Sequence, residues 1–441
     1  MFIHEDEELT HEQLLEYIKQ HQAQVPRFNE LWNQYTSRPP ILDEVKKEEF
    51  KPDNRLVVNH GRKLVETFNG YFAGISPKIN HDDDVVSDAI NDFWKRNDFG
   101  DVFAELSKLT SLYGVAYLYI WQDEETKTRV IHNPPLDMFV IKDNSIEGVT
   151  KYGVRYKFDD DNGLVGTLIT GGEIIDFNEK GFLNSSPHYY PIIPIIEFVE
   201  NDEQQSIIRP VETLINAYNK TLSFKMNDAD YFSDAYMKIL GAELDLESIQ
   251  HIKDNRIINL FGQDGTSGID VNFLDKPDGN TSQEMLLDRI ERLIFQLTIG
   301  FNPNGESYTQ ASGVALDKMT LPMQNLAGTK ERKFTKGLNS LMQCFTSLPT
   351  NVPASKRDSW IDIEYRFTRN IPRNLNDEAE VARALEGIIS KETQLSILSV
   401  VDDVKIEIEK MEDERALPEY DYQIKEEQGI NPPPFEENPL E

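Results

Sequence analysis

Apolar residues recur at helical spacing in several stretches of the chain, on either side of a central region with a different pattern. Near the N-terminus, residues 10–35 carry apolar side chains such as Leu14 and Ile18 at this spacing, and Pro26 divides them into two short helices. A more hydrophobic segment follows at residues 54–74. The N-terminal part of the chain is therefore predicted to begin with two short helices.

The pattern changes between about residues 101 and 200, which are predicted to be rich in β-strands. The run from Tyr113 to Trp121 is aromatic and β-branched. Further strands are predicted at residues 128–132, 149–158, 164–170 and 173–178. A stretch with several prolines, residues 187–200, ends this region.

Two acidic strings in this half of the chain invite a metal-binding interpretation. Residues 159–163 (Asp-Asp-Asp-Asn-Gly) resemble part of a calcium loop, but the glycine comes one residue early for an EF-hand and strand-like runs flank it. We interpret them as a hairpin turn. Residues 81–84 (His-Asp-Asp-Asp) precede a helical pattern and are better explained as negative charge at a helix N-terminus.

Two long helices with a small unit between them follow. The first starts near Pro210, and its apolar stripe comprises Val211, Leu214, Ile215, Tyr218, Leu222, Met226, Ala229, Phe232 and Tyr236. The second begins at Thr281, where Thr281 and Glu284 match a capping box, and its stripe comprises Leu286, Leu287, Ile290, Leu293, Ile294 and Leu297. Residues 237–280 between them read as a strand at 237–240, a short helix at 246–252 and strands at 256–261 and 268–274.

A loop of turn-forming residues, 301–310, ends the second long helix. A third long helix is predicted from Ser312 to about Phe345, with a kink at Pro322, because proline removes one backbone hydrogen bond. A strand-like run at 360–367 and helices within 375–415 come next, and the tail, with three prolines at 432–434 among glutamates, is predicted to be disordered. The fold class is α+β.

Composition narrows the class of protein. The 441 residues include 45 Lys plus Arg and 77 Asp plus Glu, which gives a formal charge of −32. Such a field repels phosphate and disfavours a DNA-binding repressor or a nuclease, yet it is compatible with a wall past which DNA slides without sticking. No signal peptide and no 18-residue apolar run is evident, and the single Cys344 is expected to be a buried thiol, so we expect folding in the cytoplasm.

Recognisable catalytic chemistry is missing from the sequence. It contains no phosphate-binding Gly-x-x-x-x-Gly-Lys-Ser/Thr loop, no dinucleotide fingerprint and no zinc-ligand spacing. Its carboxylates are so numerous that nominating any pair for acid–base catalysis carries little weight. We therefore expect a protein that is not an enzyme, with no metal and no cofactor.

Three stretches of the chain, taken together, resemble the portal proteins of the SPP1-like siphophage family. The first is residues 54–59 (Asn-Arg-Leu-Val-Val-Asn), continued by Val65, Phe68, Tyr71, Phe72, Gly74 and Pro77. The second is residues 210–221, continued by Asp228, Asp230, Tyr231, Phe232, Asp234, Ala235 and Tyr236. The third is residues 312–316, followed by Leu321-Pro322 and by residues 330–334 (Lys-Glu-Arg-Lys-Phe).

The resemblance implies a cyclic ring, usually of twelve subunits, and a portal fold with named regions. These are a wing (1–206 and 348–372), two stem helices (207–236 and 281–300), a clip (237–280), a tunnel loop (301–311), a kinked wing helix (312–347) and a crown (373–415), followed by the tail (416–441). The hydrophobic pattern, the turn-forming residues at 301–310 and Pro322 also predict a small unit between two long helices, a loop and a kinked helix.

The function that the resemblance implies is a channel for double-stranded DNA at one capsid vertex of the virion, used in packaging and ejection, after assembly in the host cytoplasm. Its partners would be further copies of the chain, the DNA, the terminase large subunit, the head-to-tail adaptor, and the major capsid and scaffolding proteins, with no membrane. DNA-channel residues would be Asn302, Asn304, Gly305, Ser307, Tyr308, Thr309 and Gln310, and clip docking residues Ile257, Ile258, Leu260 and Phe261. The alternatives are another phage assembly component, such as a connector, and an acidic hydrolase with a β-rich domain.

Overall fold

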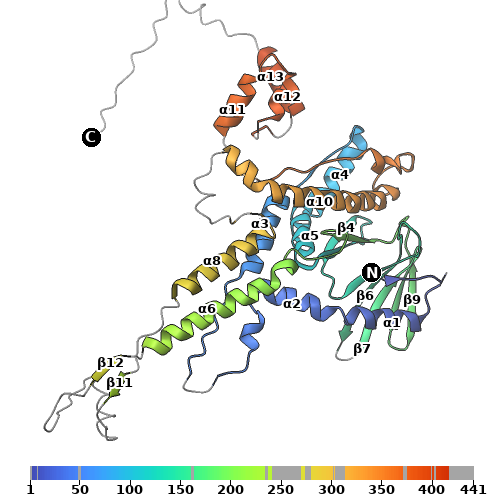
Figure 1. Ribbon diagram of the computed structural model, residues 1–441. Coiled ribbons are helices and arrows are strands. Elements are labelled where there is room, and N and C mark those ends of the chain that lie inside the picture. The colour runs from blue at the N-terminus through green and yellow to red at the C-terminus, as the bar shows by residue number, and fades with distance from the viewer. Residues whose placement is uncertain are drawn as a thin grey trace, which may run out of the picture. The chain divides into compact units, whose positions relative to one another are not determined.

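The computed structural model describes residues 2–6, 8–47, 51–159, 163–233, 237–240, 270–273, 280–300, 302, 313–370, 375–398, 400–401 and 404–416. The chain divides into two compact units, Met1–Asn370 and Ile371–Glu441 (Figure 1). Both helices and strands are abundant, which confirms the α+β class.

Six strands form the larger sheet of the first unit, in the order β1-β5-β6-β7-β8-β9. They are β1 (Phe2–Ile3), β5 (Met138–Lys142), β6 (Thr150–Asp159), β7 (Gly163–Ile169), β8 (Glu173–Asn178) and β9 (Gly181–Pro187). β1 joins β5 in parallel, and the other neighbours are antiparallel. Asp159 pairs with Gly163, which confirms the hairpin between β6 and β7, although residues 160–162 lie outside the described residues.

Helix α1 (His11–Gln22) packs on this sheet through one apolar face. Thr10 caps the helix: its hydroxyl accepts from the Gln13 amide at 3.3 Å, and its own amide donates to the Gln13 side chain at 3.0 Å. Leu14 and Ile18 then lie in a core with side chains of β5, β6, β7 and β8. The alternation of apolar residues along these strands supplies the opposing face.

A smaller sheet, in the order β10-β3-β4, consists of β3 (Val115–Gln122), β4 (Thr128–Asn133) and β10 (Ile195–Val199), all antiparallel. β10 lies inside residues 187–200, which the hydrophobic pattern marks only as the end of the β-rich region. The strand is short and mostly buried, so it lacks the alternation of apolar and polar residues that is typical of a half-exposed strand. β5 and β9 are likewise strands that the pattern does not predict.

Helix α5 (Phe99–Tyr113) packs on this sheet. Three more helices, α2 (Val25–Tyr35), α3 (His60–Ala73) and α4 (Asp84–Arg96), pack against α5. Pro26 lies in the first turn of α2 and separates it from α1, as predicted. Asp83 caps α4 by accepting from the amides of Val85 and Val86, so the acidic string there does act as helix N-terminal charge. The β-rich region begins later than predicted, at Val115, because α5 continues to Tyr113.

Helix α10 (Gly313–Ser347) crosses the smaller sheet and contacts β10. Gly337 allows this close approach, because a Cβ atom built there would lie 2.5 Å from the ring of Phe198. The 3₁₀ turns η3 (Ala354–Lys356) and η4 (Ser359–Asp362) follow, and β13 (Glu364–Arg366) pairs antiparallel with β2 (Lys78–Asn80). β13 falls within the strand-like run predicted at 360–367.

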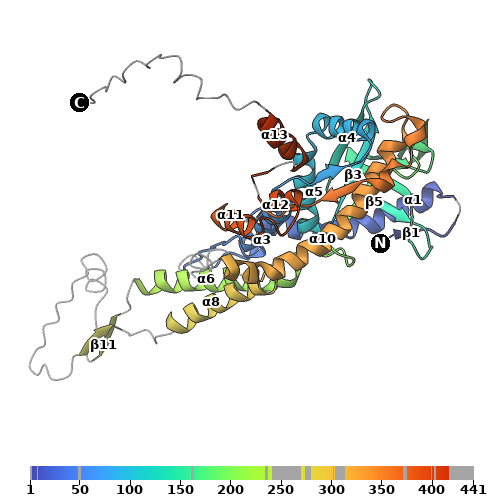
Figure 2. The ribbon, with the colours of Figure 1, turned by 90° about the horizontal axis from the view of Figure 1, so that it is seen from above.

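The helix pair α6 (Glu212–Ser233) and α8 (Asn280–Gln296) lies side by side in both ribbon views (Figures 1 and 2). Two 3₁₀ turns, η1 (Pro40–Asp43) and η2 (Arg209–Val211), contact α6. Between the two helices in sequence, β11 (Met237–Leu240) pairs antiparallel with β12 (Asp270–Phe273), matching two of the strands predicted there. The predicted helix at 246–252 and strand at 256–261 lie outside the described residues.

The second unit contains α11 (Leu375–Ala384), α12 (Lys391–Ser396) and α13 (Val404–Ala416), in agreement with the helices predicted for this part of the chain. Ser390 caps α12 by accepting from the Thr393 amide at 3.2 Å. The Gln394 side chain donates to the Ala382 carbonyl oxygen at 2.7 Å and so links α12 to α11.

Candidate functional site

Helices α6 and α8 form a helical hairpin, and side-chain contacts at two places hold the pair together. At one end of the pair, His60 of α3 is buried and its ring meets Tyr218 of α6 and Phe295 of α8 edge-on, with ring centroids 4.7 and 5.8 Å away. Burial lowers the pKa of His60, with Glu291 acting in the opposite direction. Farther along, Lys225 of α6 forms an ion pair with Glu284 of α8.

The ion pair between Lys225 and Glu284 involves a residue of the capping box predicted at the start of α8. The helix begins at Asn280, so Thr281 lies inside its first turn instead of at the N-cap, and the predicted capping box is wrong. Glu284, which would have reached back to cap the helix, instead points across to α6. The sequence signature is local, whereas the competing cation comes from a residue far away in the chain.

The buried face of α6 is unexpectedly polar. Asn219, Ser223 and Asn227 are nearly inaccessible to solvent and lie one helical turn apart. They accept hydrogen bonds from alternate backbone amides of an extended segment: Val58 N to Asn219 Oδ1 at 2.8 Å, Leu56 N to Ser223 Oγ at 2.9 Å and Asn54 N to Asn227 Oδ1 at 2.6 Å. We call this set the polar ladder.

The two periods match well enough for a ladder to form. Four helical residues advance by about 6 Å and two extended residues by about 6.6 Å, so three successive rungs stay in register. The amides at Asn54, Leu56 and Val58 need acceptors because no strand pairs with this segment in the described part of the chain. Three side chains of α6 therefore accept the backbone hydrogen bonds that the carbonyl groups of a neighbouring strand accept in a sheet.

We expect Asn219→Leu to lower the free energy of unfolding by about 1 to 3 kcal/mol, because the Val58 amide would be buried without an acceptor. Urea unfolding of the two proteins would measure the difference. Thr213→Ala, at an exposed position of the same helix, is the matched control and should change little. Equal effects of the two substitutions would contradict a structural role for the ladder.

The predicted apolar stripes of α6 and α8 are only partly covered within one chain. Val211, Ile215, Leu287, Ile290 and Ile294 are buried. Other apolar side chains of this hairpin remain exposed, namely Phe224, Met226, Met285, Leu286 and Leu297. Exposed apolar side chains gathered on one pair of helices indicate a contact surface for another molecule.

Only Asn302 of the predicted DNA-channel residues is among the described residues, and its side chain donates to Glu291 Oε1 of α8 at 3.0 Å. Asn304, Gly305, Ser307, Tyr308, Thr309 and Gln310 lie outside the described residues. So do the predicted docking residues Ile257, Ile258, Leu260 and Phe261. Their roles remain predictions.

Pro322 lies inside α10, which continues through it, and the kink there remains a prediction. The proline ring packs against Gly300, the last residue before the predicted loop. Gly300 has φ +87°, and a Cβ atom built on it would lie 2.5 Å from Pro322 Cγ. Only glycine fits both the backbone conformation and the space, so the end of the α8 segment is seated directly on the helix that follows the loop.

Lys330 of α10 is completely buried, which its place in a run of charged residues does not suggest. Its ammonium group lies 2.7 Å from Glu200 Oε2, 2.6 Å from Ser111 Oγ and 2.8 Å from the Ser107 carbonyl oxygen. The rings of Phe68, Phe72 and Phe334 surround it. Burial lowers the pKa of Lys330, and the Glu200 carboxylate opposes that shift.

These contacts bring the three resembling stretches together in space. Residues 54–59 lie along α6 through the polar ladder, and Phe68 and Phe72, which continue the same stretch, face Lys330 of the third. No property of the linear sequence reveals this convergence, because the contacting residues are more than a hundred positions apart.

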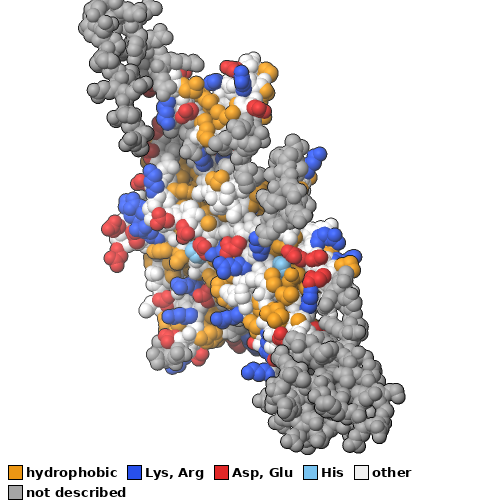
Figure 3. Space-filling model, turned by 90° about the vertical axis from the view of Figure 1, so that its left-hand side faces the viewer, with side chains coloured by type: hydrophobic (Ala, Val, Ile, Leu, Met, Phe, Trp, Pro, Cys, Tyr) orange, Lys and Arg blue, Asp and Glu red, His pale blue; other side chains and the backbone are white. Residues whose placement is uncertain are grey.

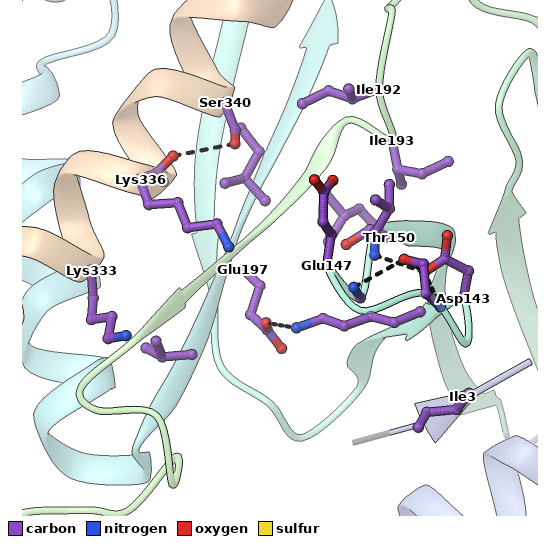
Figure 4. A pocket seen from close by; sticks show the side chains of 18 of the residues that line it. Ile3, Asp143, Glu147, Thr150, Ile192, Ile193, Glu197, Lys333, Lys336 and Ser340 are labelled. Atoms are coloured by element: carbon purple, nitrogen blue, oxygen red, sulfur yellow. Dashed lines mark hydrogen bonds and ion pairs between the residues drawn. The ribbon is translucent and has the colours of Figure 1, made fainter.

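A cavity of about 770 Å³ lies between α10, β10 and the loop after β5 (Figure 4). Lys333, Lys336 and Ser340 line the α10 side, and Asp143, Glu147 and Thr150 line the loop side. Lys142 and Glu197 form an ion pair inside it at 2.5 Å. In the loop that lines it, the Ser145 hydroxyl donates to Asp143 Oδ1 at 2.6 Å.

On the face drawn in Figure 3, Lys and Arg side chains are scattered among Asp and Glu. Within the described ranges, no cluster of His, Cys, Asp and Glu could hold a metal ion, and no helix is long and apolar enough to cross a membrane. Cys344 is a buried thiol, as predicted, and burial raises its pKa.

Comparison with known proteins gives the family. The family model described as "Phage portal protein, SPP1 Gp6-like" matches residues 14–417. The chain belongs to this portal protein family. The portal protein of Bacillus phage SPP1 is 23% identical over 400 residues, covering 83% of this chain and 77% of that protein. The portal protein of Clostridium phage phiCD119 is 21% identical over 396 residues, covering 81% and 84%.

Solved structures with some similarity come from gene transfer agent particles. A chain of the neck of an empty particle has a TM-score of 0.46 and 13% identity, covering 76% of this chain and 89% of its own. A chain of a native particle's virion has a TM-score of 0.46 and 13% identity, covering 84% and 92%. Family membership rests on the sequence match. It confirms the resemblance, and portal family members are structural proteins of the virion.

Proposed function

We propose that this chain forms a closed ring whose central channel carries double-stranded DNA into a capsid during packaging and out of it during ejection. The observation that carries the proposal is the portal family match over residues 14–417. The α6–α8 hairpin supports it, because its exposed apolar side chains need cover that a neighbouring copy in a ring would provide.

The proposed regions follow the sequence prediction. Residues 1–206 and 348–372 would be the wing, α6 and α8 the stem, residues 237–280 the clip, 301–311 the tunnel loop and 373–415 the crown. The ring, of twelve copies as the resemblance implies, would occupy one vertex of the virion after assembly in the host cytoplasm. Its clip would meet the terminase large subunit and later the head-to-tail adaptor, while capsid and scaffolding proteins would surround the wing.

The proposed mechanism relies on weak contacts with DNA. A chain with a formal charge of −32 offers little attraction for phosphate, and residues 301–310 contain no Lys or Arg. Contacts from amides and hydroxyls of this loop would be brief hydrogen bonds, which allow a duplex to slide. This proposal assigns no catalytic turnover to the chain itself.

Ring closure can be tested at the α6–α8 hairpin. Leu286→Glu should prevent ring closure, because a carboxylate would be buried in the contact between copies without a partner. Mass photometry and end-on electron micrographs of the purified proteins would count rings and monomers. Ile146→Glu, which adds the same charge at a fully exposed apolar residue elsewhere, is the matched control and should leave rings intact.

Two results would contradict the proposal. One is a wild-type protein that remains monomeric at micromolar concentration in several salts. The other is a Leu286→Glu variant that closes into rings as efficiently as the control. The first would also favour the alternative of a different assembly component.

A further inference from the structure

Strand β9 is an open edge of the six-stranded sheet. It stands last in the strand order and pairs only with β8 among the described residues. From Phe182 to Pro187 every residue of the strand is exposed. An edge strand presents unpaired backbone N–H and C=O groups on its free side, which makes it a template for another strand.

Natural edge strands usually carry charges that block such pairing, and β9 does not. Residues 181–196 contain no Asp, Glu, Lys or Arg, although 28% of the chain is charged. Phe182 and Leu183 are 39% and 57% exposed. Pro187 lies at the end of the strand, so it leaves the central residues open for pairing.

A hollow of about 730 Å³ reaches from β6 across β7 and β8 to Phe182 of β9. The apolar part of its lining is Leu168, Ile175, Phe182, Pro191, Ile192 and Ile193, and the charged residues Glu8, Asp143 and Lys151 also line it. A strand added to β9 would place alternate side chains on this face of the sheet. Backbone pairing combined with a pocket for alternate side chains is typical of proteins that bind partners by strand addition.

The symmetry of a ring excludes pairing between the β9 strands of two copies. Pairing of β9 with β9 of a second copy would be isologous and would produce twofold dimers, whereas a closed ring needs head-to-tail contacts. Figure 1 shows β9 at the side of the sheet away from α6 and α8. If α6 and α8 surround the channel, β9 lies on the outside of the ring, where the capsid shell is.

We propose that β9 binds an extended segment of the capsid shell protein by strand addition. The segment would be uncharged, to match the charge-free strand, and would carry apolar side chains at alternate positions, to match the apolar part of the hollow near Phe182. This inference rests on the proposed function, since it needs a ring surrounded by a shell. It adds a specific docking surface, residues 182–186 of β9, to that function.

Hydrogen–deuterium exchange of the β9 amides would test the pairing directly. The probes are the isolated ring and the same ring in DNA-free shells assembled from the capsid protein of the same phage. We expect the amides on the free side of β9, which alternate along residues 182–186 with those that face β8, to exchange on the order of tenfold more slowly in the shell, because paired amides open less often. A photo-crosslinking amino acid at Asn184 should attach to one segment of the shell protein.

Substitution supplies the second test. Leu183→Lys with Ser185→Lys should reduce incorporation of rings into shells on the order of tenfold, because charges on an edge oppose pairing. Ring formation by the purified variant should not change. Ile146→Lys, at an exposed apolar residue outside β9, is the matched control and should be incorporated normally.

The outcomes separate this inference from the proposed function. Protection of the free-side amides of β9 in the isolated ring would show that a second copy covers the strand, and a cross-link to scaffolding protein would identify a different partner. Either result, or unchanged exchange in the shell, overturns strand addition by the shell protein. A protein that forms no ring would instead contradict the proposed function.

Discussion

Replacing Lys330 by methionine is expected to lower the free energy of unfolding by about 3 to 5 kcal/mol, because Glu200 would remain buried without its partner. Urea or thermal unfolding would measure the loss. Lys333→Ala is the matched control: this lysine is one turn away and pairs with an exposed Asp202, so its loss should cost less than about 1 kcal/mol. Similar losses of stability from the two substitutions would contradict the claim that the buried Lys330–Glu200 pair matters more than the exposed Lys333–Asp202 pair.

The cause can be tested by a second substitution. Adding Glu200→Gln to Lys330→Met should restore much of the stability at neutral pH, since no buried charge is left.

Deleting residues Asn304 to Thr309 is expected to leave rings and DNA-free shells intact while reducing packaged or retained DNA, on the order of tenfold if the loop supplies the contacts that hold the duplex. The deleted segment has one side-chain amide, three hydroxyls and one carboxylate, and it has no cation. Full and empty capsids, separated on a density gradient, give the measurement.

The structure supplies a control for that deletion. Gly300→Ala would place a Cβ atom against Pro322 and strain a positive φ, so it should disturb the seat of the loop while keeping every loop residue. Packaging should then fall together with stability, whereas the deletion should affect packaging alone. A deletion that abolishes rings, or one that leaves packaging and retention unchanged, would contradict the proposed role of this loop.

Much of the architecture follows from local sequence signals. Pro26 separates α1 from α2, Asp83 caps α4, and the hairpin at residues 159–163 lies where turn formers interrupt two alternating runs. In each case the deciding interaction joins residues close in sequence. The same holds for the order of long helix, small unit and long helix, since helical periodicity is a property of each segment alone.

The features that the sequence patterns did not predict correctly depend on contacts between residues far apart in the chain. The sequence pattern does not predict β10, because a mostly buried strand does not show alternating apolar and polar residues. The capping box at Thr281 failed because Glu284 finds Lys225 on another helix. The apolar stripe of α6 was expected to mark its buried face. It does not show that Asn219, Ser223 and Asn227 are also buried.

The sequence by itself determined the α+β class, the long helices, the acidic character and the family, because these depend on composition, local periodicity and motif order. Tertiary structure alone decided that Lys330 is buried against Glu200, that the polar ladder secures residues 54–58 along α6, and that β9 is a bare edge. Each of these depends on which distant groups exclude water or supply a hydrogen-bond partner. Burial and pairing are properties of the folded neighbourhood, and a residue's type and position in the chain do not specify them.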